Sequence, residues 1–274
     1  MKPISVKDHL VSKETFHIVF DSGVGAWKTT PQPSQQELKA YYPKEGYLSH
    51  TDNAQGLKDR LYLWVKNMNI QTKLRWIPVK SNRPKLLDFG AGNGAFALAA
   101  QEKGWRVYTQ EFSDDVLLSL KAKGLKTVDV SQQKDAFDAI TLWHVLEHLP
   151  NPKAQLATFY NALAPGGILV LALPNTNAWD ARHYGAQWAA YDVPRHLWHY
   201  NKTAIAQLAK DAGFHLVKTR NMFWDAFYIS LLSEQYRQSK CAWINAIIKG
   251  SLSNLLGWRK KNTSALTFIL QKLK

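Results

Sequence analysis

The sequence contains one cysteine, Cys241, among its 274 residues. A lone thiol excludes a disulfide framework and any zinc site that is built from several cysteines. The chain also lacks a run of about 18 apolar residues and an apolar N-terminal stretch, so neither a membrane span nor a signal peptide is expected. These absences favour a cytoplasmic protein and leave open a peripheral position at the inner membrane face.

Acidic residues are scarce relative to basic ones, with 21 Asp and Glu against 35 Lys and Arg. Residues 84–174 carry 8 basic and 9 acidic side chains, whereas residues 1–83 carry 13 and 7, and residues 222–274 carry 8 and 2. These basic flanks favour anionic partners such as lipid head groups or phosphorylated glycans, although a merely solvated surface is equally compatible. No lysine-rich tract is long enough for a nucleic-acid arm, so nucleic acid is not an expected partner.

Residues 86–96, LLDFGAGNGAF, are the most informative stretch that is present. Two apolar residues lead into Asp88, glycines follow at positions 90, 92 and 94, and an apolar run begins after them. This pattern predicts a buried strand, a tight turn and the start of a helix. Because glycine has no Cβ, the backbone of such a turn can approach a ligand closely. The spacing also satisfies the dinucleotide fingerprint, so a dehydrogenase is an alternative at this point.

Strands and helices alternate after this turn, which indicates a right-handed parallel α/β sheet. The predicted helices are 95–103, 114–123, one that opens at Asn151 and ends by 163–167, and 202–212. The predicted strands are 105–111, 125–129, 137–143, 168–174, 213–220 and 265–271.

Several stretches together resemble the class I S-adenosylmethionine (SAM)-dependent methyltransferases, most closely the subfamily of the ubiquinone-biosynthesis O-methyltransferases. They are LLDFGAGNGAF, Glu111-Phe-Ser, Val128-Asp129-Val, FDAITLWHVLEHLPNP and LAPGGILVLALPN. The resemblance implies an α/β fold with a doubly wound, Rossmann-like seven-stranded sheet. This sheet would be mostly parallel with an antiparallel last strand, and it would carry N-terminal and C-terminal helical additions. A dehydrogenase does not account for His-Val-Leu-Glu-His at 144–148 or for the Pro-Gly-Gly before 168–174.

The resemblance also implies SAM as the cofactor. In the family, the acid and glycines of the loop hold the methionine end of SAM, a second acid binds the ribose, and an Asp lies near the adenine amino group. On this sequence the ribose acid is Glu111 and the adenine Asp is Asp129, and Phe112 would pack on the adenine face. The implied cofactor-binding residues are Asp88, Gly90, Gly92, Asn93, Gly94, Glu111, Phe112, Asp129 and His144.

The N-terminal segment contains Val6-Lys-Asp-His-x-Val-Ser12, Thr29-Thr-Pro-Gln-Pro33 and Tyr41-Tyr through Tyr47-Leu-Ser-His50. These stretches resemble the leader of a group of bacterial methyltransferases, which usually contains a small zinc ribbon ahead of the catalytic domain. The cysteine positions of this ribbon are not occupied by cysteine here, so a metal-free hairpin of 16–20 with 26–30 is expected. Apolar residues at helical spacing from 55 to 77 then predict an amphipathic helix over the cofactor. The expected order is a degenerate ribbon-like leader (1–50), a cofactor-covering helix and linker (51–83), the methyltransferase core (84–221), a helical insertion or lid (222–262) and the final strand (263–274).

Two segments near the C-terminal side of the sheet are rich in large apolar side chains. Residues 174–200 are aromatic and follow the predicted fifth strand, at the sheet edge where ligands bind, so they suit an acceptor pocket. Residues 222–262 predict two amphipathic helices. These helices would form a cap on the body or a lid or, beside Arg259-Lys-Lys261, a peripheral membrane contact.

Three histidines, His144, His148 and His196, are candidate catalytic bases. Methyl transfer from a sulfonium is an in-line displacement in which alignment supplies much of the rate. A hydroxyl acceptor must also lose a proton, which suits an imidazole with a pKa of about 6.5. Structural or substrate-binding roles are the alternatives for each. The ubiquinone O-methyltransferases associate a divalent metal with an acid-x-x-Glu-His stretch, but His144 replaces that acid, so no metal is expected.

The sequence therefore predicts a SAM-dependent methyltransferase that methylates an oxygen of a small-molecule, lipid-linked or glycan acceptor. The motif of base-amine methyltransferases, Asn/Asp-Pro-Pro-aromatic, is missing after residues 137–143, and Cys241 lies in no motif for pyrimidine C5 methylation. An RNA-directed methyltransferase that uses the basic flanks is the alternative, and a non-catalytic SAM-binding protein is the second. The sequence gives no indication of the oligomeric state.

Overall fold

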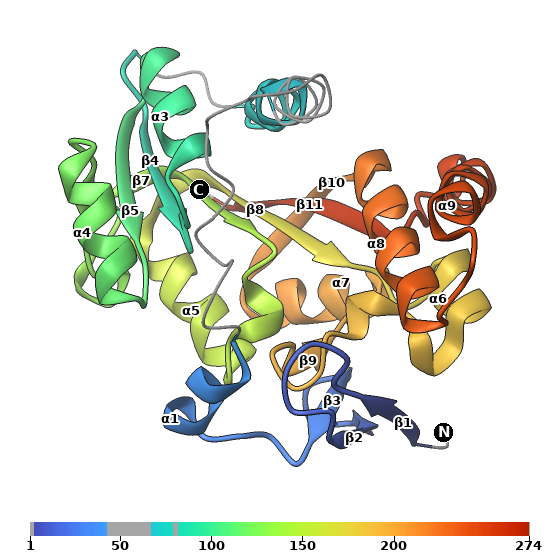
Figure 1. The fold of residues 1–274 in the computed structure, drawn as a ribbon. Helices are drawn as coiled ribbons and strands as arrows, with labels where there is room; N and C mark the ends of the chain where they lie inside the picture. The colour runs from blue at the N-terminus through green and yellow to red at the C-terminus, as the bar shows by residue number, and fades with distance from the viewer. Residues whose placement is uncertain (1–2, 43–66, 79–81, 274) are drawn as a thin grey trace.

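The computed structural model describes residues 3–42, 67–78 and 82–273, and its main feature is a seven-stranded sheet (Figure 1). The strand order is β10-β11-β8-β7-β4-β5-β6. Strands β4 to β8 pair in parallel, while β11 runs antiparallel to both β10 and β8, so the predicted doubly wound sheet is confirmed. The strands are β4 (Lys85–Phe89), β5 (Arg106–Gln110), β6 (Lys126–Thr127), β7 (Phe137–Trp143), β8 (Leu163–Pro174), β10 (Phe214–Met222) and β11 (Ala265–Lys272).

Helices cover both faces of this sheet because its central strands are apolar on both sides. Leu86 and Leu87 follow one another in β4 and are both fully buried, yet they belong to two different hydrophobic clusters. Leu87 packs with residues of α5 and α7, whereas Leu86 packs with residues of α3 and α4. The helices are α3 (Ala95–Glu102), α4 (Asp114–Ala122), α5 (Pro152–Ala162) and α7 (Lys202–Asp211).

Two asparagines fix where α5 and α7 begin. The side chain of Asn151 accepts a hydrogen bond from the backbone N–H of Ala154 at 3.2 Å, and Asn201 does the same with Ala204 at 2.9 Å. Such caps satisfy a backbone donor that has no partner inside the helix. Both helices therefore start where the sequence predicted.

One predicted strand is shorter than expected. The pattern at 125–129 predicts five residues, but β6 has only two, Lys126 and Thr127. The side chain of Asp129 accepts from the backbone N–H of Ser131 at 2.9 Å and caps the short helix η2 (Val130–Gln132). This local hydrogen bond competes with strand pairing and turns the chain away from the sheet.

The leader forms a second sheet with the strand order β1-β2-β3-β9. Its strands are β1 (Ile4–Lys7), β2 (Thr15–Asp21), β3 (Ala26–Thr30) and β9 (Trp198–His199). The predicted hairpin is β2 with β3, but neither β1 nor β9 was predicted. A two-residue strand such as β9 shows no alternating pattern, so its pairing with β3 is visible only in the structure. After β3 come α1 (Gln35–Leu38) and η1 (Lys39–Tyr41).

Part of the aromatic segment 174–200 folds into a buried core. Tyr184, Trp188 and Tyr191 are buried and pack with Val6 and Phe16 of the leader sheet. Much of the aromatic content of this segment therefore joins the leader to the body, and a role of the remaining residues in an acceptor pocket stays a prediction. The short elements of the segment are α6 (Trp179–Tyr184), η4 (Gly185–Gln187), η5 (Ala189–Tyr191) and β9.

The predicted cofactor-covering helix is described only from residue 67. Residues 67–75 are helical, and Ile70 and Leu74 pack against the cluster that contains Leu86. The part of the prediction that falls on 55–66 lies outside the described residues.

Two helices follow β10, as predicted for 222–262: α8 (Phe223–Tyr236) and α9 (Ala242–Trp258). Figure 1 shows this pair at the opposite end of the large sheet from α4. No helix within the described residues has both the length and the apolar character needed to cross a membrane.

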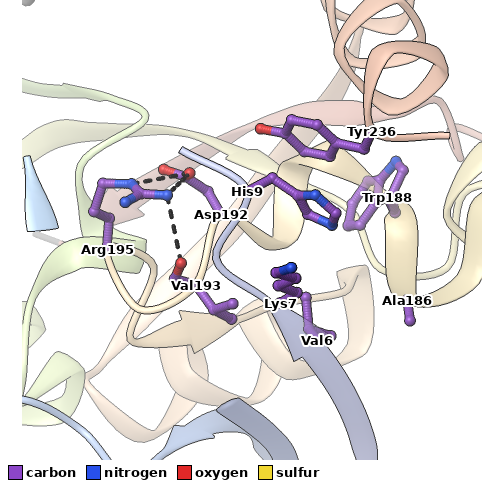
Figure 2. A pocket seen from close by; sticks show the side chains of 9 residues that line it. All are labelled: Val6, Lys7, His9, Ala186, Trp188, Asp192, Val193, Arg195 and Tyr236. Carbon is purple, nitrogen blue, oxygen red and sulfur yellow. Dashed lines mark hydrogen bonds and ion pairs between the residues drawn. The ribbon is translucent and has the colours of Figure 1, made fainter. Parts of the chain in front are cut away.

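A buried ion network around Arg195 ties the leader to the body. The guanidinium, 3% exposed, donates to Asp8 at 3.0 Å, to Asp192 at 2.7 Å and to the backbone carbonyl of Tyr41 at 2.8 Å. Figure 2 shows Arg195 directed at Asp192. Burial raises the pKa of Asp8, but Arg195 and two backbone N–H groups outweigh it and bring this pKa to about 2.

Asp8→Asn should lower the free energy of unfolding by about 2 kcal/mol at neutral pH. The loss is smaller than the full cost of an unpaired buried charge because Asp192 still neutralises Arg195. Urea denaturation measures it. The matched control is Asp135→Asn, which removes the more exposed ion pair with Lys272 (2.8 Å) and should lower the free energy of unfolding by much less.

The pH dependence of the free energy of unfolding gives a second check on the role of Asp8. The pKa of Asp8 is lower in the folded chain than its ordinary 3.8, so its stabilisation is full above that value and disappears as the pH falls toward 2. The Asn variant should lose this part of the acid sensitivity. Equal effects of the Asp8 and Asp135 variants would show that the network does not hold the leader.

Candidate functional site

The glycine-rich turn lies between the end of β4 and the start of α3. Gly90, Gly92 and Gly94 have φ angles of +72°, +52° and +80°, a region that L side chains rarely adopt. A Cβ on Gly90 would lie 2.5 Å from the side chain of Val145, and one on Gly94 would lie 2.8 Å from Leu120. A Cβ on Gly92 would meet nothing within 4 Å. Gly90 and Gly94 are thus required by internal packing, whereas Gly92 faces open space.

Asp88 lies at the base of this turn, almost completely buried in β4. Its carboxylate accepts a hydrogen bond from the hydroxyl of Thr141 at 2.8 Å. Burial raises the pKa of Asp88 to about 7, because the opposing effects of Thr141 and of the nearby Lys73 ammonium are smaller. A cation close to this carboxyl group would favour its charged form.

Glu111 joins the turn to the end of β5. Its carboxylate accepts the backbone N–H of Gly92 at 2.9 Å and that of Phe112 at 2.8 Å. Phe112 is 53% exposed, and its ring contacts Phe89 edge-on at 5.5 Å between centroids. The structure therefore brings Asp88, the turn and Glu111 to one edge of the sheet, with an exposed aromatic ring beside them.

Asn93 and Asp129, which also belong to the predicted cofactor set, have local hydrogen bonds. The side chain of Asn93 accepts the backbone N–H of Ala95 at 3.1 Å, within the turn. Asp129 is exposed after β6, and its pKa is lowered by hydrogen bonds from the hydroxyl and backbone N–H of Ser131.

His144 lies directly after β7, in an ion network of its own. Its Nε2 is 3.2 Å from the carboxylate of Asp225 in α8, and its Nδ1 is 3.5 Å from that of Glu147. Burial lowers the pKa of His144, but the two carboxylates outweigh this effect and raise it to about 9. At neutral pH the side chain is therefore an imidazolium, which has no lone pair for accepting a proton.

Lys73 and Asp225 are site residues that the sequence analysis missed. The Lys73 ammonium lies 4.4 Å from the centroid of the Trp143 ring and interacts electrostatically with Asp88 and Asp225. Burial lowers the pKa of Lys73. Both residues come from helices outside the sheet, and no spacing in the sequence links them to the glycine turn.

Glu147, His148 and His196 form a cluster behind His144. Glu147 and His148 lie in the short helix η3 (Leu146–His148), and His196 comes from the segment just before β9. One potential ligand atom from each lies within 4.8 Å of the others. The fully buried Glu147 side chain makes no hydrogen bond to the described residues. Burial raises the pKa of Glu147, but His144 and the two other imidazoles lower it, so it remains a carboxylate.

The hydrogen bonds of the two imidazoles define where their protons lie. Nδ1 of His148 is 2.9 Å from the carbonyl oxygen of Arg195, and Nδ1 of His196 is 2.9 Å from that of Ala190. A carbonyl only accepts, so each Nδ1 carries a hydrogen and each neutral ring presents an unprotonated Nε2. Burial and His196 lower the pKa of His148 to about 4.

A small cavity, too tight for a water molecule, adjoins this cluster. Glu147, His196 and Tyr200 line it, and the buried Tyr200 hydroxyl makes no hydrogen bond to the described residues. The remaining lining residues are Pro174, Thr176, Trp188, Ala190, Trp198 and His199.

The cluster fits the divalent metal implied by the acid-x-x-Glu-His resemblance poorly. Magnesium prefers oxygen ligands, whereas this set offers one carboxylate and two imidazoles. The position of the first acid holds His144, whose positive charge already lies beside Glu147. His144 therefore supplies the charge that an ion would bring.

Comparison with known proteins shows whether the glycine turn belongs to a methyltransferase or to a dinucleotide-binding dehydrogenase. Residues 59–219, more than half of the chain, match the family described as a methyltransferase domain. The chain belongs to this methyltransferase family. It is a class I SAM-dependent methyltransferase with SAM as its cofactor, as predicted, and the dehydrogenase alternative is wrong.

Similar curated proteins carry the name ubiquinone biosynthesis O-methyltransferase. The protein from Thiobacillus denitrificans is 29% identical over 174 residues, which cover 56% of this chain and 75% of that protein. The protein from Xanthomonas oryzae pv. oryzae is 28% identical over 159 residues, 52% of this chain and 66% of the relative. The match thus leaves a quarter to a third of these relatives uncovered.

Solved structures share the fold at lower identity. Phosphoethanolamine N-methyltransferase 2 of Haemonchus contortus, in complex with SAM, gives a TM-score of 0.52 at 20% identity over 77% of this chain and 53% of that chain. A mycolic acid cyclopropane synthase complexed with S-adenosylhomocysteine gives 0.54 at 14% identity over 77% and 85%. These similarities concern the fold of the methyltransferase.

Gly92→Ala should weaken binding of S-adenosylhomocysteine roughly tenfold or more, because the added methyl group projects into the open space at the turn. Isothermal calorimetry measures the affinity. Gly124→Ala is the matched control, since Gly124 also has a positive φ (+77°) and an unobstructed Cβ position but lies in the turn after α4. Equal affinities for both variants would show that Gly92 does not face the cofactor.

Elemental analysis of the purified protein should find no metal in stoichiometric amount, and a chelator should leave its melting temperature unchanged. The reason is that His144 balances the charge of Glu147, and that the leader lacks cysteine. A stoichiometric metal that is lost in Glu147→Gln and kept in the exposed control Glu102→Gln would place an ion in the cluster and contradict this expectation.

Proposed function

We propose that this methyltransferase transfers the methyl group of SAM to a hydroxyl oxygen, with an imidazole of the Glu147–His148–His196 cluster as the base. The observation that supports this proposal is the hydrogen bond from each Nδ1–H to a carbonyl, which leaves two unprotonated Nε2 atoms beside a buried carboxylate. Loss of a proton from the acceptor is the one step that alignment alone does not supply.

For the cofactor, we infer that Asp88 and the turn, including Asn93, hold the methionine end of SAM. A carboxyl group with a pKa of about 7 becomes fully charged when the ammonium and sulfonium groups of SAM approach it. Glu111 would accept the ribose hydroxyls, and the exposed ring of Phe112 would pack on the adenine, with Asp129 near its amino group.

His144 was a candidate for both the base and the cofactor site. With a pKa of about 9 it is protonated at neutral pH, so we assign it a positioning role between Glu147 and Asp225. Its charge also stabilises the carboxylate of Glu147 inside the protein.

His196 is the stronger of the two remaining candidates. It lines the cavity together with Glu147, and a carboxylate oxygen of Asp192 lies 3.9 Å from its Nε2. A nearby carboxylate stabilises the imidazolium that forms when the ring accepts a proton. His148 is the second candidate, and its pKa of about 4 makes it a weaker base.

The proposed acceptor is a small-molecule, lipid-linked or glycan hydroxyl. The name of the curated relatives supports oxygen as the acceptor atom, and a peripheral membrane contact through 222–262 would suit a lipid-linked acceptor. Transfer of labelled methyl from SAM to an alkyl-chain catechol, a soluble catechol, an oligosaccharide and total RNA tests the class. Label on a hydroxyl of the first three supports the proposal, and label on RNA alone would replace it with an RNA-directed activity.

His196→Asn should lower turnover about 10²–10⁴-fold while leaving the affinity for S-adenosylhomocysteine within a factor of about two. The asparagine amide can still donate to the carbonyl of Ala190, so the variant removes the Nε2 lone pair and retains the positioning hydrogen bond. Steady-state kinetics with the best probe of the acceptor panel gives the turnover.

The pH profile separates a base from a structural role. A base must be deprotonated to act, so the activity of the native enzyme should fall on the acid side, and His196→Asn should flatten that limb. The control is His215→Asn, an exposed position at the start of β10, which pairs with Gln271 beside the start of β8 and so lies at the opposite edge of the sheet from the end of β7. If His196→Asn keeps native turnover and His148→Asn loses it, His148 is the base instead.

A further inference from the structure

In the helix pair α8 and α9, small side chains are buried and large apolar side chains are exposed, which is the reverse of an ordinary amphipathic helix. The face of α9 that is buried against the protein carries small residues: Ala246, Gly250, Ser253 and Gly257. A Cβ on Gly250 would lie 2.7 Å from Cδ1 and 3.1 Å from Cα of Phe227, so the two helices approach closely there. Association through small residues is typical of helices whose large side chains face lipid.

The large apolar side chains of α9 point outward. Six of them are 54–70% exposed: Trp243, Ile244, Ile247, Ile248, Leu255 and Trp258. At 3.6 residues per turn these positions form one stripe about 140° wide, and its centre lies about 120° around the helix from the centre of the small residues. Phe223, Trp224 and Tyr228 of α8 are also exposed, at 42–65%. We call these nine residues the hairpin face.

Basic residues border the hairpin face. Lys240 precedes α9, and Arg259, Lys260 and Lys261 follow it, while α9 contains no acidic residue. Trp243 and Trp258 lie at its two ends. Tryptophan at the ends and lysine or arginine at the border are the features of a helix that lies in the plane of a membrane interface.

The positive charge beside the hairpin face also indicates what binds to this face. An anionic lipid surface complements the four basic residues at the ends of α9, each of which contributes attraction near the membrane. A second copy of this chain, docked through the same face, would bring two positive borders together and would be repelled. Charge complementarity therefore favours the lipid surface over self-association.

We propose that the hairpin face is a peripheral membrane-binding surface that docks on an anionic bilayer. The proposal of a membrane-binding surface is based on the packing and charge of α8 and α9. Only its use in delivering a lipid-linked acceptor rests on the proposed function. Asp225 of α8 contacts His144 at 3.2 Å, so docking places the site edge of the methyltransferase next to the bilayer.

Co-sedimentation with vesicles tests the surface without any methyl transfer. The native protein should bind vesicles of phosphatidylcholine with phosphatidylglycerol and should bind pure phosphatidylcholine vesicles more weakly. Ile247→Ser with Leu255→Ser should weaken binding roughly tenfold or more, since two exposed apolar side chains are removed from the contact. The matched control is Leu118→Ser, because Leu118 is 66% exposed on α4, at the other end of the sheet.

A charge series tests the border. Replacing Arg259, Lys260 and Lys261 with Gln should weaken binding to the anionic vesicles roughly tenfold or more, whereas Gln at the exposed Lys121, Lys153 and Lys210 should not. All variants should retain native affinity for S-adenosylhomocysteine, which shows that they fold. The proposal is overturned if the native protein fails to sediment or the double serine variant binds like it. A native dimer that this variant dissociates would assign the face to a second copy.

Discussion

Arg195 is the residue on which the arrangement of the site depends. Its guanidinium joins Asp8 of the leader to Asp192 of the segment that carries His196 and β9. The same residue accepts the Nδ1–H of His148 through its backbone carbonyl. One side chain and its own backbone thus fix the leader sheet and the proton position of His148 together. A small sheet with a two-residue edge strand would gain little from backbone pairing alone, so the buried charges supply the specificity.

The sequence predicts best those features that depend on near neighbours. The starts of α5 and α7, the glycine turn and the hairpin of the leader each depend on a few neighbouring residues, and the structure confirms them. The alternation of strands and helices was sufficient for the topology because parallel crossovers have one favoured hand. The antiparallel last strand followed from the family resemblance.

The features that were missed join distant residues. Asp8 and Arg195 are 187 positions apart, and His144 and Asp225 are 81 apart, so no window along the chain contains either pair. The aromatic segment 174–200 shows a different limit. Its composition suits a pocket wall and a core equally well, and in the structure Trp188 both packs with the leader and lines the small cavity. Likewise, the positive charge of His144 depends on Glu147, which lies in the same sequence motif, and on Asp225, which lies outside it.

Glu111 has a consequence for the thermodynamics of cofactor entry. Its carboxylate already accepts two backbone N–H groups, from Gly92 and Phe112, so the rotamer of this long side chain is set when the protein folds. A carboxylate has about four acceptor positions, so roughly two are left for the hydroxyls of a ribose. Ordering such a side chain on binding typically costs about 0.5–1.5 kcal/mol, and here that entropy is lost before the ligand arrives. The ribose subsite that we propose is in this sense preorganised. The affinity for the cofactor is therefore not reduced by the entropic cost of ordering the Glu111 side chain.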